Sequence, residues 1–161
     1  MIQRATDGAS AGTISQAHTR ADGSFTATVP TGSSRMIVLA YRAFTDAGYA
    51  AQANIRESVA AGVQLRIAPR RTTPNGTIIL TGKVQGPIPP KGALVDLLVY
   101  YRRHWEPFHT TRTDRDGRFT VVYQFEGAVG RFPFRAEAPQ GQARFPYSGG
   151  YSNVIDVATT G

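Results

Sequence analysis

The chain has 161 residues, of which 41% are hydrophobic and 18% charged, a balance typical of a folded protein and not of a disordered one. The absence of cysteine excludes disulfide bonds and thiolate metal sites, and no apolar run is long enough to span a membrane. The net charge of +7 lies mainly in residues 62–161 as scattered arginine, which predicts a solvated basic surface and no nucleic-acid partner.

Up to residue 61 the sequence predicts a loose N-terminus and four short strands. Residues 1–11 are small and polar, so we expect them to be disordered or loosely attached. Alternation of apolar and other residues then predicts strands at residues 13–19, 24–29, 36–44 and 51–59. Asp22-Gly23 is expected to form a hairpin turn, because glycine reaches positive φ with little strain and aspartate can bond its own backbone.

Ala60-Ala61-Gly62 is the predicted domain boundary, and the strand pattern restarts after it. Seven strands are predicted at residues 63–67, 77–84, 95–101, 105–113, 119–125, 132–136 and 152–158. Seven strands in about 100 residues is the number found in an immunoglobulin-like β-sandwich. Since no stretch has a period of 3.6 residues, we expect an all-β protein with almost no helix.

Two segments of the chain repeat. Thr19-Arg20-Ala21-Asp22-Gly23-Ser24-Phe25-Thr26 returns as Thr113-Asp114-Arg115-Asp116-Gly117-Arg118-Phe119-Thr120, and Tyr41-Arg42-Ala43 returns as Phe134-Arg135-Ala136. The repeat predicts a tandem fold, with a complete sandwich at residues 62–159 preceded by the last four strands of a similar one at residues 12–61. An incomplete sandwich leaves apolar faces open. We therefore expect a second chain, in a homo-oligomer or by strand exchange, or the second domain itself to cover residues 12–59.

Several motifs also carry a family resemblance. Val63-Gln64-Leu65-Arg66-Ile67-Ala68-Pro69 and Gly82-Lys83-Val84 resemble the first half of immunoglobulin-like repeats in actinobacterial secreted proteins. Trp105-x-x-Phe108 and Asp116-Gly117-Arg118-Phe119 resemble the second half. Residues 21–44 are similar to the back half of carboxypeptidase-regulatory-like domains. The resemblance implies an extracellular or envelope-associated module and implies no catalytic residues.

Catalytic and metal-binding patterns are weak. There is no cysteine, no G-x-S-x-G motif and only three histidines, so we predict that the chain is not an enzyme. His104 and His109 are five residues apart and would point to opposite faces of an extended strand, which argues against a metal site. Asp114-x-Asp116-Gly117 resembles part of a calcium loop, but Phe125 stands where that loop needs glutamate, so a turn is the better interpretation.

Aromatic residues are the one positive indication of a ligand. The candidate ligand-contacting residues are Tyr100, Trp105, Phe108, Phe145, Tyr147 and Tyr151. Exposed rings in one plane stack on sugar faces, as in carbohydrate-binding modules. The competing interpretation is that Trp105 and Phe108 fill the core of the sandwich, as a central tryptophan does in such folds. Exposure of the rings as a coplanar row would favour sugar binding, and their burial would favour a scaffold.

The sequence therefore predicts a non-catalytic immunoglobulin-like module that serves as spacer, scaffold or adhesion domain of a larger exported protein. The alternatives are a carbohydrate-binding module with a polysaccharide partner, and an enzyme of unrecognised type. No cofactor, metal or membrane insertion is predicted. Because no apolar segment follows Met1-Ile2-Gln3-Arg4, we expect the export signal of such a protein to lie outside this chain.

Overall fold

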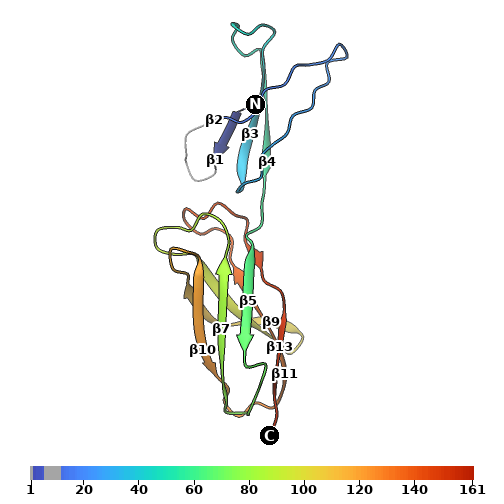
Figure 1. Ribbon diagram of the computed structural model, residues 1–161. Helices are drawn as coiled ribbons and strands as arrows, with labels where there is room; N and C mark the ends of the chain where they lie inside the picture. Colours follow the sequence, from blue (N-terminus) through green and yellow to red (C-terminus); the bar gives the residue numbers. More distant parts are fainter. Residues whose placement is uncertain (1, 6–11) are drawn as a thin grey trace. The chain divides into compact units, whose positions relative to one another are not determined.

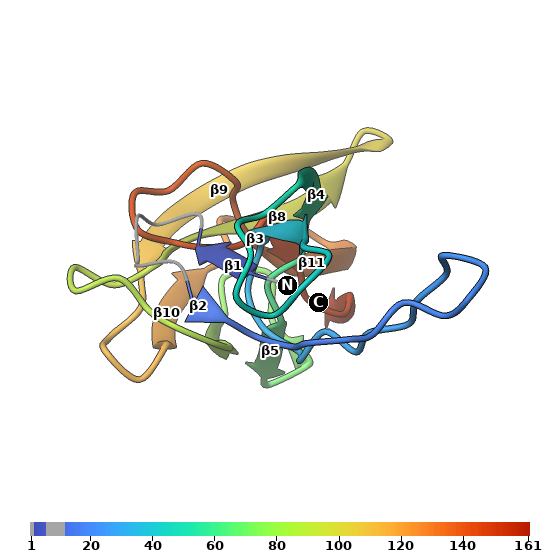
Figure 2. The same cartoon turned by 90° about the horizontal axis from the view of Figure 1, so that it is seen from above.

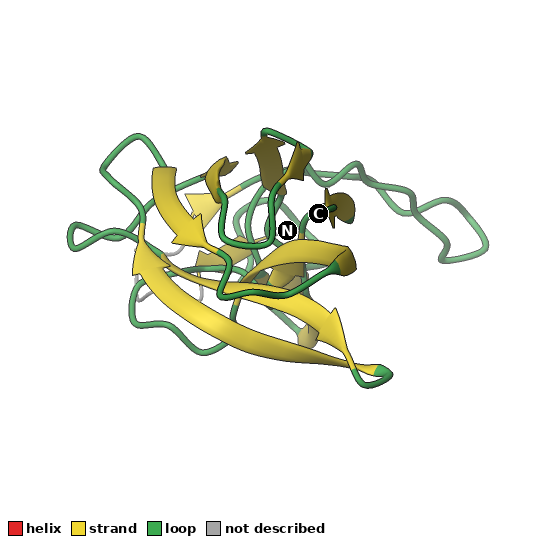
Figure 3. Ribbon diagram, turned by 90° about the horizontal axis from the view of Figure 1, so that it is seen from below, coloured by secondary structure: helices red, strands yellow, loops and turns green. Residues whose placement is uncertain are grey.

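The computed structural model describes residues 2–5 and 12–161 and is all-β, as predicted: over these residues it contains strands, turns and loops and no helix (Figures 1 and 3). Accordingly, no described helix could cross a membrane. The chain divides into two compact units, an N-terminal unit, Met1–Val59, and a C-terminal unit, Ala60–Gly161. Each unit has its own sheets.

The C-terminal unit holds two sheets whose pairings are antiparallel except for one short parallel pair. The first sheet has the order β10 (Arg118–Gln124), β7 (Thr77–Val84), β5 (Val63–Ala68). The second has the order β6 (Arg71–Thr72), β13 (Ile155–Thr159), β11 (Gly130–Ala138), β8 (Leu94–Tyr101), β9 (His104–Arg112), with β12 (Gly150–Tyr151) also paired to β11. Each of the seven strands that the sequence predicts in this region is present, with ends shifted by a few residues.

Alternate residues of these strands form one apolar core. In β5 the side chains of Val63, Leu65 and Ile67 are buried while their neighbours are exposed. The same alternation holds in β7 and β13. The buried residues of both sheets belong to a single cluster, with Phe134 and Leu97 among its members. Full burial of a side chain of this size stabilises the fold by about 1.5–3 kcal/mol, so this cluster is the main source of the unit's stability.

The N-terminal unit holds one sheet and a long arm. The sheet has the order β2 (Gly12–Thr13), β1 (Ile2–Ala5), β3 (Arg35–Tyr41), β4 (Ala51–Glu57). Residues 14–34 form the arm, drawn in blue in Figures 1 and 2, without regular strand pairing. The predicted turn lies at its tip, where the Ser24 N–H donates to Asp22 Oδ1 at 2.9 Å and Gly23 has a φ of 81°.

Three predictions for this unit need correction. Residues 2–5, expected to be loose, form β1, because β3 has a free edge on which Ile2 pairs with Val38; residues 1 and 6–11 lie outside the described part of the chain. The expected strand at residues 13–19 is reduced to the two residues of β2. Residues 24–29 alternate as a strand does but form none, because no described strand lies beside them to complete a hydrogen-bonded ladder.

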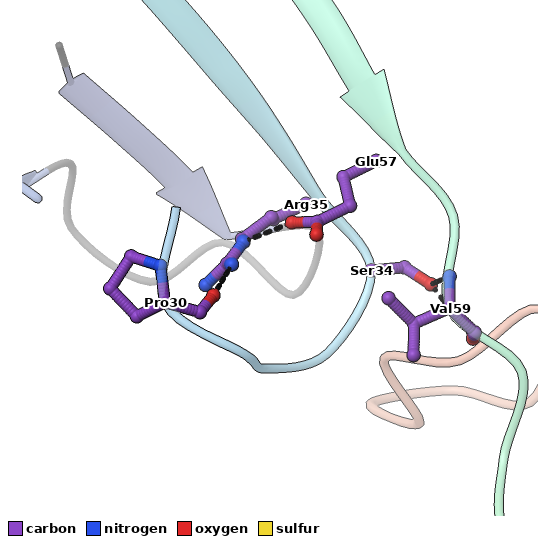
Figure 4. A network of polar contacts seen from close by, with 5 residues as sticks. All are labelled: Pro30, Ser34, Arg35, Glu57 and Val59. Atoms are coloured by element: carbon purple, nitrogen blue, oxygen red, sulfur yellow. Dashed lines mark hydrogen bonds and ion pairs between the residues drawn. The ribbon is translucent and has the colours of Figure 1, made fainter. Parts of the chain in front are cut away.

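Polar contacts fix the base of the arm to the sheet (Figure 4). Arg35 is buried at the start of β3, where its guanidinium donates to the Glu57 carboxylate and to the Pro30 carbonyl. Beside it, Ser34 Oγ accepts from the Val59 N–H at 2.8 Å. A buried charge is tolerated when it is paired and hydrogen-bonded, so this network holds together the point where arm, β3 and β4 meet.

Candidate interaction surface

Aromatic and charged side chains gather on the outward face of the second sheet of the C-terminal unit. On β8 and β9, Tyr100 and Trp105 lie opposite each other, with ring centroids 5.3 Å apart and planes inclined by 57°. On β11, Arg135 and Glu137 point to the same side because they are two residues apart. Tyr151 of β12 pairs with Glu137. Strand pairing thus joins residues far apart in the sequence into one surface.

Arg135 organises this surface. Its guanidinium carbon lies 4.2 Å from the centroid of the Trp105 ring and 4.1 Å from that of the Tyr151 ring. We call Tyr100, Trp105, Arg135 and Tyr151 the Arg135 stack. A cation over an aromatic ring contributes about 0.5–2 kcal/mol, and here one cation is shared by two rings. The Arg135 Nε is buried without a hydrogen-bond partner, so the rings are its main contacts on that side.

The stack also shields apolar surface. Leu98 lies on the outward side of β8, opposite Arg135 on one neighbouring strand and Pro107 on the other, yet it is buried. A long arginine side chain covers apolar surface with its methylene groups while its charged end stays accessible. Arg135 therefore has a structural role as well as a place in the exposed surface.

The ionisation of Tyr151 is tied to the same surface. A hydrogen bond to the Glu137 carboxylate, together with the negative charge of that carboxylate, raises the pKa of the Tyr151 hydroxyl above its ordinary value. Arg135 acts in the opposite direction. A raised pKa in the folded state means that this contribution to stability is present below about pH 10 and is lost as the pH rises through the pKa of folded Tyr151.

We expect Glu137→Gln to lower the pKa of Tyr151 toward its ordinary value, because the substitution removes the negative charge that opposes the phenolate. The measurement is the pH titration of the tyrosine Cζ signals by carbon-13 NMR. The pKa of Tyr123 is raised mainly by burial, so its titration serves as a control that Glu137→Gln should leave unchanged. An unchanged titration of Tyr151 would contradict the contact with Glu137.

The other three candidate aromatics lie elsewhere. Phe108 sits where β9 bulges opposite Leu97 and Leu98, and it packs on the core with its ring 5.5 Å from that of Phe134. Phe145 is buried and Tyr147 is packed against the core, with their rings 5.2 Å apart. The structure thus brings Tyr100, Trp105 and Tyr151 together at the surface and places the remaining three at the core.

Sequence reasoning missed Arg135 and Glu137. Their alternation along a predicted strand indicated a solvent-facing side, but not that this side lies beside Trp105. The pairing of β11 with β8 is long-range, and no motif in the sequence specifies it.

The weaker sequence patterns take ordinary structural roles. His104 Nε2 lies 2.6 Å from Glu106 Oε1, and the described residues contain no group of three or more metal-ligating side chains. Asp114 Oδ1 accepts the backbone N–H groups of Asp116 at 2.9 Å and Arg118 at 2.8 Å. Its carboxylate thereby closes the turn that contains Gly117.

Comparison with known proteins gives a distant likeness to a solved structure. No family model and no curated protein matches the chain. Among solved structures it is similar to the sensor domain of the anti-sigma factor RsgI4 in Pseudobacteroides cellulosolvens, with 10% sequence identity and a TM-score of 0.41. The match covers 62% of this chain and 93% of that one. A likeness at this level carries no argument about function.

Proposed function

We propose that the chain is a non-catalytic, immunoglobulin-like β-sandwich module, tandem with an incomplete first unit, that acts as spacer, scaffold or adhesion domain of a larger exported protein. The observation that supports this most directly is the single apolar core shared by the two sheets of the C-terminal unit. Two sheets that together contain seven long strands and share one core are typical of immunoglobulin-like modules. Such modules present binding surfaces on a rigid framework and occur widely on cell surfaces, which supports a location outside the cell or in its envelope.

The Arg135 stack supports adhesion to a protein more than stacking on a sugar. Arg135 lies over one face of Trp105 and one face of Tyr151, and Tyr100 is tilted against Trp105. A sugar needs a free, flat row of rings, whereas this arrangement uses several ring faces internally. Tyrosine, tryptophan and arginine held rigid by one another are the residues that dominate protein–protein interfaces.

Carbohydrate binding is the second candidate, and one observation favours it. Tyr100 and Tyr151 are both exposed at the edges of the stack. Their outer faces remain available to a ligand even though the central ring is covered by Arg135.

A glycan array with the intact chain separates the two functions. The scaffold or adhesion role predicts no bound glycan. Sugar binding predicts a retained glycan whose affinity falls by about tenfold or more in Tyr100→Ala and Tyr151→Ala, because each substitution removes an aromatic ring that contacts the ligand. Tyr49→Ala is the control, because Tyr49 is an exposed tyrosine of the N-terminal unit and is not a member of the stack. If a glycan binds, and Tyr49→Ala keeps this binding while the two stack variants lose it, the second candidate is correct and our proposal is wrong.

A further inference from the structure

The turn of the sequence repeat has the same hydrogen bonds in both units. In the C-terminal unit the Asp114 N–H donates to the Arg118 carbonyl at 2.8 Å, and the Gly117 N–H donates to the Asp114 carbonyl at 3.2 Å. In the N-terminal unit the corresponding bonds join Arg20 to Ser24 at 2.7 Å and Gly23 to Arg20 at 2.9 Å. Gly117 and Gly23 have φ values of 80° and 81°. The repeat is therefore structural as well as sequential.

The sheets correspond too. The order β2-β1-β3-β4 in the N-terminal unit parallels β9-β8-β11-β13 in the C-terminal unit, strand for strand along the chain. Residues 24–30, after the repeated turn, correspond to β10. The described part of the N-terminal unit has no counterpart of β5 or β7. The sequence predicted only the last four of seven strands in this unit, but β1 takes the position of β8, so among the described residues only β5 and β7 have no counterpart.

Side chains that are buried in the C-terminal unit are open at the corresponding positions of the N-terminal unit. Phe119 is 4% exposed and its repeat counterpart Phe25 is 46% exposed. Phe134 is 2% exposed and its counterpart Tyr41 is 49% exposed. A Cβ placed on Gly117 would lie 2.2 Å from the Val84 carbonyl oxygen of β7, whereas one placed on Gly23 would have no atom within 4 Å. The same turn packs against β7 in one unit and against nothing described in the other.

The open side of the N-terminal unit is a continuous apolar groove. Two adjoining hollows, of about 280 and about 430 Å³, share Phe25, Ala27 and Leu39 in their walls. Across from the arm, Ala53 and the half-exposed Ile55 of β4 complete the groove. The groove thus lies between residues 24–30 and the β3–β4 hairpin, where β5 and β7 would lie by analogy with the C-terminal unit.

We propose that this groove binds a β-hairpin of a partner chain that takes the places of β5 and β7. One strand of the hairpin pairs with the backbone of residues 25–29, which lie between the hydrogen-bonded Ser24 and Pro30, and alternate aliphatic side chains from both strands enter the groove. The chemistry of the occupant follows from its counterpart, in which Leu65, Ile67, Ile78 and Leu80 are among the buried residues. Addition of strands to an open edge gains affinity from main-chain hydrogen bonds and specificity from the side-chain pockets.

A second copy of the chain fits the groove less well. Each copy offers one extended segment beside the groove, residues 25–29, while two strand positions are empty. The groove belongs to the N-terminal unit and the Arg135 stack to the C-terminal unit. The proposal for the groove therefore does not depend on the scaffold or adhesion role proposed above.

The first test uses a fluorescently labelled synthetic peptide of residues 62–85, which contains β5 and β7, with the intact chain. Fluorescence anisotropy is expected to show saturable binding with one peptide per chain. Ile55→Asp should weaken it by about tenfold or more, because a carboxylate would enter the apolar groove. Asn54→Asp adds the same charge on the opposite side of β4 and is expected to change affinity by less than about twofold.

A second test joins the two strands covalently to the chain, so that their pairing no longer depends on the affinity of a free peptide. A fusion that places a copy of residues 62–93 ahead of Met1 supplies the two strands in the chain order of the C-terminal unit. Amide hydrogen exchange at residues 25–29 is expected to slow in the fusion relative to the intact chain. Fast exchange at residues 25–29 both in the fusion and with saturating peptide would overturn the proposal. The proposal would also be overturned if light scattering shows that the chain forms a dimer, and if Ile55→Asp dissociates this dimer while the peptide does not.

Discussion

Val121→Asp is expected to unfold the C-terminal unit, whereas Val122→Asp is expected to leave it folded. The two valines are neighbours on β10, but Val121 is 8% exposed and Val122 is 66% exposed. Val121 lies opposite Leu80 in the core, and Val122 lies opposite the exposed Ile79. An ionised carboxylate at Val121 would lose its hydration without gaining a partner, at a cost of about 3–5 kcal/mol. That is a large part of the roughly 5–15 kcal/mol that stabilises a domain.

Urea unfolding followed by tryptophan fluorescence measures this difference directly. Trp105 is the only tryptophan of the chain, so its signal reports the C-terminal unit alone. With a slope of about 1–3 kcal/mol per molar urea, Val121→Asp should lower the midpoint by roughly 1–5 M or abolish the transition. Val122→Asp should stay within about 0.5 kcal/mol of the parent chain. Equal midpoints for the two variants would show that the register of β10 is misassigned.

The long strands of the C-terminal unit were predictable because each carries its own signal. Val63, Leu65 and Ile67 alternate with polar residues, and a strand with one face in the core must show that period. In the N-terminal unit the same alternation predicted β3 and β4, but it failed for β1 and for the segment before β3. The segment Ile2–Ala5 has no such alternation and becomes a strand because the edge of β3 is free. Residues 24–29 have the alternation and lack the neighbouring strand.

The candidate surface was predictable only in part, for a related reason. Sequence spacing placed Tyr100 and Trp105 on neighbouring strands, where a short hairpin connects β8 and β9. The position of Arg135 depends on the pairing of β11 with β8, which joins distant parts of the chain. Phe108 was a candidate ligand contact, yet a bulge in β9 turns it to the core. The alternation of residues along a strand specifies which side chains share a face, whereas the pairing of distant strands decides which of these side chains lie beside one another.

The Gly117 turn gives the second large effect. We expect Gly117→Ala to destabilise the C-terminal unit by about 3–4 kcal/mol, which combines the cost of a positive φ with that of a steric clash. The Cβ of alanine would lie 2.2 Å from the Val84 carbonyl oxygen. That oxygen belongs to β7, whose Val84 N–H donates to the Gly117 carbonyl at 2.8 Å, so relief of the clash would break this bond.

Gly127→Ala is the matched control for Gly117→Ala. Gly127 lies in the same unit and has a φ of 77°, but a Cβ there would meet no atom within 4 Å. Gly127→Ala should therefore lower the free energy of unfolding only by the cost of the positive φ, about 1–2 kcal/mol. The urea midpoint from Trp105 fluorescence should fall clearly further in Gly117→Ala than in Gly127→Ala. If the two midpoints fall equally, the turn does not pack against β7, and the contrast between Gly117 and Gly23 no longer indicates an unfilled strand position in the N-terminal unit.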